Sequence, residues 1–165
     1  MARVEPVWNT IDDALVAALD NIRSSQNGDY WHEVRKVYTE AYGVEESGVP
    51  KASLPAIIVE RVPSAQPRSL VGGSQTVSSK LLYQLTVVMR NDQGDRTRPS
   101  KEMNRMVQDI HRALTADVTL GLGRVERLRF PFEPLLDSGA LATESDRMVF
   151  RYAVEIAYSF DESLP

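Results

Sequence analysis

The side chains that most often perform chemistry are scarce in this chain. It has two histidines, His32 and His111, and no cysteine, which excludes disulfides and thiolate chemistry and permits a reducing compartment. His32 follows a tryptophan, and no second ligand stands near it at the spacing of a zinc site. His111 lies one turn from Val107 in a helical pattern, which favours a partly exposed position on a helix. The histidines therefore indicate neither a catalytic site nor a metal site.

Motifs for phosphate binding and nucleophilic catalysis are also incomplete. Residues 121–126, "GLGRVE", lack a third glycine and precede a strand pattern instead of a helix. Residues 71–76, "VGGSQT", lack the P-loop lysine, and no G-x-S-x-G pentapeptide is present. One loop-like stretch holds four acids that leave a carboxylate pair or a cation site open, although their spacing matches no EF-hand: Glu133, Asp137, Glu144 and Asp146. A solvated loop is the favoured interpretation, and we expect no catalytic residue, no cofactor and no enzyme activity.

Composition is that of one ordinary globular domain. The 165 residues are 42% hydrophobic and 25% charged. With 23 acidic and 19 basic residues the net charge is −4, so no global field attracts nucleic acid or anionic membrane. Arg124, Arg127 and Arg129 form a local cluster whose spacing favours solvent-facing positions on a strand. No stretch has the length of a bilayer span or a signal peptide, so we expect a soluble, intracellular product.

Two segments have the three- and four-residue spacing of amphipathic helices. The first is residues 11–22, "IDDALVAALDNI", for which Thr10 is the expected N-cap, with Asp12 and Asp13 favoured by the helix dipole. The second runs from Ser100 to about Thr115. Its expected apolar stripe is Met103, Val107, Ile110 and Leu114.

Four further segments read as strands: 57–62, 80–90, 124–130 and 147–160. In the longest two, alternate residues are apolar, and we expect Leu85, Val87, Val154 and Ile156 to be buried under the helices. Residues 30–42 are ambiguous, because their spacing favours a helix while their composition is typical of a strand. The sequence therefore predicts an α+β fold, with a mostly antiparallel sheet of about four to five strands and two α-helices packed on one face.

Two long loops are expected, at about 63–79 and 131–146. Loops of this length in compact domains are usually functional or disordered. Apolar residues in them must be covered, either by their own domain or by another subunit. The candidate partner-binding residues are Leu70, Val71, Gly72, Gly73, Phe132, Leu135 and Leu136.

Several pieces, spread over nearly the whole chain, resemble the tail terminator (tail completion, head–tail joining) proteins of long-tailed bacteriophages. They include "IDDALVAALDNI", the "NGDYWHEVRKVY" that follows it, and the strand "YQLTVVMR". The most characteristic are "LPAIIVE", the run L-x-A-D-x-T-L-G from Leu114 to Gly121, and the closing strand "RYAVEIAYSF". The resemblance implies a strand around Arg35 to Thr39. It also implies a turn after the second helix, where Gly121 and Gly123 permit backbone angles that other residues resist.

The resemblance implies a non-enzymatic virion protein with a single tail-terminator-like domain over residues 1–165. In this family the subunits form a ring, usually hexameric, that caps the tail tube, ends its polymerisation and presents a surface to the neck of the head. The implied partners are other copies of the chain, the tail tube protein and the head–tail connector or neck proteins. Genomic DNA passes through the lumen without specific binding, and no membrane is involved. The implied location is the tail–neck region of the virion, and the host cytoplasm during assembly.

Three alternatives stay open. A neighbouring neck protein of the head-closure or connector type would share the size and the role. A small binding module of cellular origin and a hydrolase that uses the loop acids follow in that order.

Overall fold

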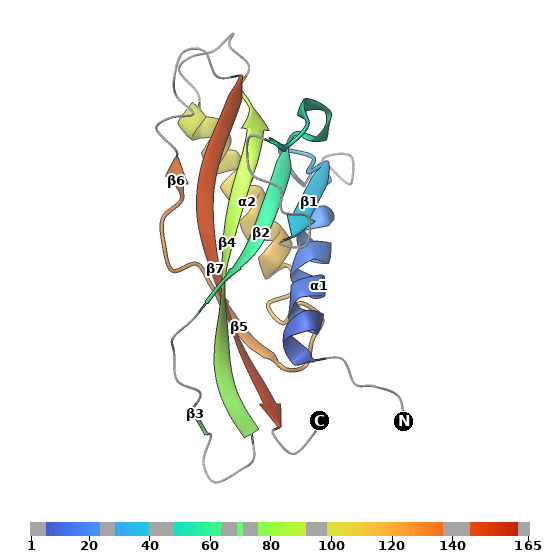
Figure 1. Cartoon of the computed structure of the whole chain (residues 1–165), viewed down its shortest axis with the longest axis vertical. Helices are drawn as coiled ribbons and strands as arrows, with labels where there is room; N and C mark the ends of the chain where they lie inside the picture. The colour runs from blue at the N-terminus through green and yellow to red at the C-terminus, as the bar shows by residue number, and fades with distance from the viewer. Residues whose placement is uncertain are drawn as a thin grey trace.

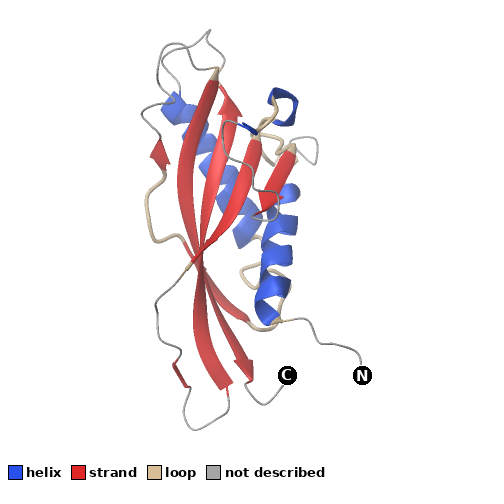
Figure 2. Ribbon diagram, viewed as in Figure 1, coloured by secondary structure: helices blue, strands red, loops and turns tan. Residues whose placement is uncertain are grey.

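The computed structural model describes residues 6–23, 29–39, 48–63, 69–70, 76–91, 99–136 and 146–161. In these ranges the chain forms two α-helices and one twisted sheet (Figure 1; Figure 2). The helices are α1 (Val7–Asp20) and α2 (Pro99–Thr115). The strands are β1 (Lys36–Thr39), β2 (Ala56–Val62), β3 (Ser69–Leu70), β4 (Thr76–Arg90), β5 (Val125–Arg129), β6 (Leu135–Leu136) and β7 (Arg147–Asp161). A short 3-10 helix, η3 (Lys51–Ser53), precedes β2.

The main path of the sheet is β1-β2-β4-β7-β5. Only β1 and β2 are parallel to each other, and every other pairing is antiparallel. The two-residue strands extend this path, since β3 pairs with β4 and β6 pairs with β7 at stretches that β2 and β5 do not reach. The α+β class, the mostly antiparallel sheet and the two helices are confirmed.

The centre of the sheet is one long ribbon. β4 and β7 pair over their full length, from Thr76↔Asp161 to Arg90↔Arg147. In Figure 1 the end of the ribbon near Thr76 and Asp161 extends past both helices. The ribbon thus serves as the base on which the helices pack and as the support for β3 and β6 near its two ends.

Both helices pack on one face of this sheet and share one core with it. α1 contributes Ile11, Leu15 and Leu19 at four-residue steps, and α2 contributes Met106, Ile110 and Leu114. The facing positions of β4 and β7 alternate with polar ones, as a half-buried strand requires. They include Tyr83, Leu85, Val87, Phe150, Tyr152, Val154 and Ile156, so the predicted burial of Leu85, Val87, Val154 and Ile156 is confirmed.

The opposite face of the sheet is covered only in part. Val49 and Leu54 pack there against Ile58 and Val88. Further along, this face carries polar side chains such as Lys80 and Glu155, whose charged atoms are 3.2 Å apart. A sheet with one apolar face and one largely polar face is the arrangement expected when helices cover a single side.

Several predicted boundaries are wrong. α1 begins at Val7 with Pro6 as its N-cap, four residues before the predicted start, and the Thr10 hydroxyl bonds back to the Pro6 carbonyl instead of capping the helix. Asp12 therefore lies in the second turn of the helix, where its carboxylate accepts a hydrogen bond from the hydroxyl of the buried Tyr83. β1 at Lys36–Thr39 agrees with the strand that the resemblance implied there, against the helical spacing.

The two predicted loops are shorter than expected in the described ranges. Within 63–79, Ser69–Leu70 form β3 and β4 already begins at Thr76; within 131–146, Leu135–Leu136 form β6. A strand of two residues is too short to show alternation in the sequence. β3 and β6 form because β4 and β7 supply their pairing partners.

The turn after α2 is organised by Asp117. Its carboxylate accepts hydrogen bonds from the amide and hydroxyl of Thr119, at 2.9 and 2.6 Å, and from the amide of Gly121 at 2.9 Å. Leu120 and Gly121 take left-handed backbone angles, with φ of 53° and 71°. The predicted need for glycine is therefore confirmed at Gly121, whereas Gly123 has no positive φ.

Candidate functional site

The two most exposed large apolar side chains in the described ranges lie three positions apart in the chain. Phe132 is 64% exposed and Leu135 is 68% exposed. Leu135 belongs to β6, which pairs with β7 on one side and has no second neighbour among the described strands. We call Phe132, Leu135 and Leu136 the apolar edge. An open strand edge with exposed apolar side chains is a typical protein-binding surface.

Stacked aromatic rings fix the chain just before the apolar edge. The rings of His111 and Phe130 are 3.9 Å apart, and those of Phe130 and Tyr152 are 5.5 Å apart and nearly parallel. The Tyr152 hydroxyl is hydrogen-bonded to Nε2 of His111. Burial lowers the pKa of His111, which favours the neutral imidazole, while burial and the charge of Glu133 raise the pKa of Tyr152 to about 12. His111 is partly exposed on a helix, as predicted, but it also supports Phe130.

The predicted partner-binding residues fall into two separate regions. Leu70 in β3 lies beside Val77, which pairs with Phe160, whereas Leu136 pairs with Phe150. Ten residues along β7 correspond to roughly 33 Å, so Leu70 and the apolar edge lie near opposite ends of the ribbon. Val71, Gly72 and Gly73 lie outside the described residues, as do the side chains of Leu70 and Leu136.

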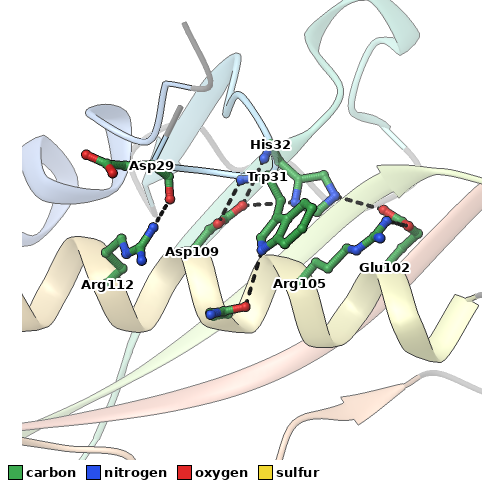
Figure 3. Close-up of polar contacts among 8 residues, drawn as sticks. Asp29, Trp31, His32, Glu102, Arg105, Asp109 and Arg112 are labelled. Carbon is green, nitrogen blue, oxygen red and sulfur yellow. Dashed lines mark hydrogen bonds and ion pairs between the residues drawn. The ribbon is translucent and has the colours of Figure 1, made fainter. Parts of the chain in front are cut away.

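A polar cluster that the sequence did not predict joins residues 29–32 to α2 (Figure 3). Asp109, only 1% exposed, accepts hydrogen bonds from the backbone amides of Trp31 and His32, at 3.0 and 2.9 Å. Nδ1 of His32 lies 3.0 Å from the same carboxylate, and Nε2 lies 3.0 Å from Glu102. Arg105 pairs with Glu102 at 2.6 Å and places its guanidinium 4.6 Å from the centre of the Trp31 ring. We call these five residues the His32 cluster.

The geometry of the His32 cluster sets the charge of the imidazole. A carboxylate only accepts hydrogen bonds, so both ring nitrogens of His32 must carry a proton to bond Asp109 and Glu102 together. Burial of the imidazole lowers the pKa of His32, but the hydrogen bonds and charges of Asp109 and Glu102 outweigh burial and raise it above its ordinary value of 6.5. For Glu102, partial burial raises the pKa, and the contacts with His32 and Arg105 lower it by more.

The two histidines should give opposite pH dependences of stability. His32 is favoured in its charged form, so its contribution to the free energy of unfolding is present below about pH 6.5 and is lost as pH rises through its folded-state pKa. His111 is favoured in its neutral form, so its contribution is present above about pH 6.5 and is lost as pH falls. Urea unfolding of wild type, His32→Gln and His111→Gln between pH 5 and pH 9 measures both contributions. If the difference in free energy of unfolding between wild type and a variant did not change with pH, the charge state assigned to that histidine would be wrong.

The contacts of the His32 cluster are those of an anchor that holds residues 29–32 on α2. The two ring nitrogens of His32 contact different carboxylates, and no group of His, Asp or Glu in the described ranges could hold a metal ion. Of the four loop acids, Glu133 is exposed and Asp146 pairs with Lys51, while Asp137 and Glu144 lie outside the described residues. The sequence holds one feature by which Asp109 could have been found: it is an acidic residue directly beside the apolar stripe of α2, next to Ile110.

The chain matches no protein-family model and no curated protein. In the described ranges, neither helix has the length and apolar character of a membrane span.

Proposed function

We propose that this protein is a structural subunit that assembles into a ring on the end of a phage tail tube, ends the growth of the tube and joins it to the neck. The proposal combines the resemblance of "LPAIIVE", the turn at 114–121 and the closing strand to tail terminator proteins with one structural observation. That observation is the apolar edge, where Phe132 and Leu135 are more than 60% exposed and Leu135 lies on β6, which has no second neighbour among the described strands.

The apolar edge has the properties of a subunit contact. Covering an exposed Phe and Leu stabilises a complex by roughly 25 cal/mol for each Å² of apolar surface that leaves water. The backbone groups of β6 that face away from β7 have no partner among the described strands, and they can add a further strand by hydrogen bonding. The stack of His111, Phe130 and Tyr152 holds the preceding residues in place, so little conformational freedom is lost when a partner binds.

The separation of the two regions supports a protein with more than one partner. A terminator must contact neighbouring subunits and also a tube end or a connector. The apolar edge and β3 lie roughly 33 Å apart along the ribbon. One subunit is therefore long enough for two partners to bind at the same time, one at the apolar edge and one at β3.

Leu135→Lys should abolish ring formation and leave the fold intact. The substitution places a charge in the centre of the apolar edge, while the exposed position of Leu135 means that the monomer loses no core packing. Light scattering over a concentration series, with negative-stain imaging, should show wild-type rings of about 111 kDa for six subunits of 18.5 kDa. The variant should stay at the mass of one subunit.

Val118→Lys is the matched control, because Val118 is a large exposed apolar residue in the turn after α2, away from β6. It should assemble like wild type. Rings from Leu135→Lys that are as stable as wild-type rings would count against the apolar edge. A wild-type protein that forms no ring at any concentration, and none on tail tubes, would count against the proposed function itself.

A further inference from the structure

Strand β5 and the residue before it present three arginines whose guanidinium groups have no partner in the described part of the chain. Arg124, Arg127 and Arg129 are exposed, and their guanidinium groups contact no acceptor in the described part of the chain. Every other arginine in the described ranges has a hydrogen bond, an ion pair or another polar contact. We call these three residues the arginine row.

The arginine row continues directly into the apolar edge. β5 pairs with β7 at residues 155–158, and β6 pairs with β7 at residues 150–151. Both strands therefore lie along the same side of β7, with Arg129 and Phe132 only three positions apart in sequence. A partner that covers the apolar edge also reaches the arginine row, and an acidic surface on this partner would complement the three arginines.

The charge of the molecule favours a second copy of the chain over a nucleic acid as that partner. Of 19 basic residues the row holds three, which leaves 16 basic residues against 23 acidic ones elsewhere in the sequence. This acidic remainder repels a polyanion and attracts the arginine row of another copy.

Helix α1 is the acidic counterpart among the described elements. It contains Asp12, Asp13 and Asp20 and no lysine or arginine. Asp13 is exposed and has no described partner, and Asp20 is half exposed beside Arg23, at 3.3 Å. Seven residues bring Asp13 and Asp20 to the same side of the helix, roughly 10 Å apart. The arginine row extends over roughly 16 Å of strand, so both carboxylates fit within its length.

We propose that the arginine row of one copy binds the acidic face of α1, at Asp13 and Asp20, of the next copy. This inference rests on the proposed ring. The two surfaces differ, so each contact leaves one arginine row and one α1 free for further copies, and such head-to-tail contacts close into a ring when the rotation permits. Exposed ion pairs contribute little affinity each, so the row mainly selects the partner surface and speeds association, while the apolar edge supplies burial.

The test uses two charge-reversed chains. The first is Arg127→Glu/Arg129→Glu, and the second is Asp13→Lys/Asp20→Lys. When either variant is present alone, like charges meet at every contact. The protein concentration at which rings form should therefore rise at least tenfold. When the two variants are mixed one to one, each acidic β5 meets a basic α1 and each basic β5 meets an acidic α1, so rings of alternating variants should form again.

Circular dichroism checks that both chains are folded. Lys101→Glu, on the exposed side of α2, is the control for a charge change elsewhere.

Each outcome of this experiment either supports or overturns the proposed contact between the arginine row and α1. Recovery of rings in the mixture alone supports the contact. Normal rings from both reversed chains, beside intact wild-type rings, overturn the inference and leave the proposed function standing. Loss of rings by the arginine variant with normal rings from the aspartate variant overturns α1 as the partner. Binding of random-sequence duplex DNA that the arginine substitutions abolish, without any effect on rings, would assign the row to nucleic acid instead.

Discussion

Ile156→Ala should lower the free energy of unfolding by about 2–5 kcal/mol, the range for deleting a large buried aliphatic side chain. Ile156 is completely buried and lies between Leu81 of β4 and Leu128 of β5 in the register of the sheet. Three adjacent strands therefore lose packing at one point, and the cavity lies under the helices. For a domain of this size the melting temperature should fall by at least about 5 °C. Urea and thermal unfolding measure both quantities.

Glu155→Ala is the control on the neighbouring position of the same strand. Its side chain is on the opposite face, where it pairs with Lys80 at 3.2 Å. A pair of this kind near the surface is worth about 0–1 kcal/mol, so the variant should unfold close to wild type. A larger effect from Glu155→Ala than from Ile156→Ala would mean that the two faces of β7 are reversed.

Asp109→Ala should be the most damaging polar substitution, at about 3–5 kcal/mol, the range for removing one partner of a buried charged pair. The change leaves the amides of Trp31 and His32 without their acceptor and the imidazolium without its closer carboxylate. Residues 29–32 would then detach from α2, and Trp31 would lose its fixed position. Chemical unfolding gives the free energy, and tryptophan fluorescence, compared with a Trp31→Phe background, reports the detachment.

Glu102→Ala provides the comparison within the same cluster. Glu102 contacts the other ring nitrogen of His32 but is about a third exposed, so water can replace it. We expect a loss of about 1 kcal/mol or less. Equal losses from the two substitutions would show that burial of Asp109 does not set the strength of this anchor.

The sequence predicted the parts of the fold in which many residues repeat one pattern. The alternation in β7 and β4 identified the buried face correctly, and the apolar stripe located α2 within one residue. The start of α1 was missed because Thr10 has the chemistry of an N-cap, whereas the N-cap position is held by Pro6, which makes no side-chain cap and whose φ of −56° suits a helix start. The parallel pairing of β1 with β2 involves only four register positions and leaves no periodic signal.

The candidate site was only partly predictable because its contacts are distant in sequence. Phe132 and Leu135 were recognised by type, as apolar residues among turn-forming ones. That Leu135 lies on an open strand edge depends on the pairing of β6 with Arg151 and Phe150 of β7. The contact between His32 and Asp109 spans 77 positions, and a single sequence gives no indication of which helix faces which segment.

The length of the β4–β7 ribbon also determines how the chain can fold. Register partners lie 57 to 85 positions apart, and such pairings form slowly because a large loop must close before any contact is gained. During synthesis β4 leaves the ribosome well before β7, so Leu85 and Val87 have no second strand beside them until residues 147–161 emerge. A chain stopped before β7 exposes the central strand of its own sheet, which is the state most prone to aggregation. Folding of the whole domain therefore waits for its last strand.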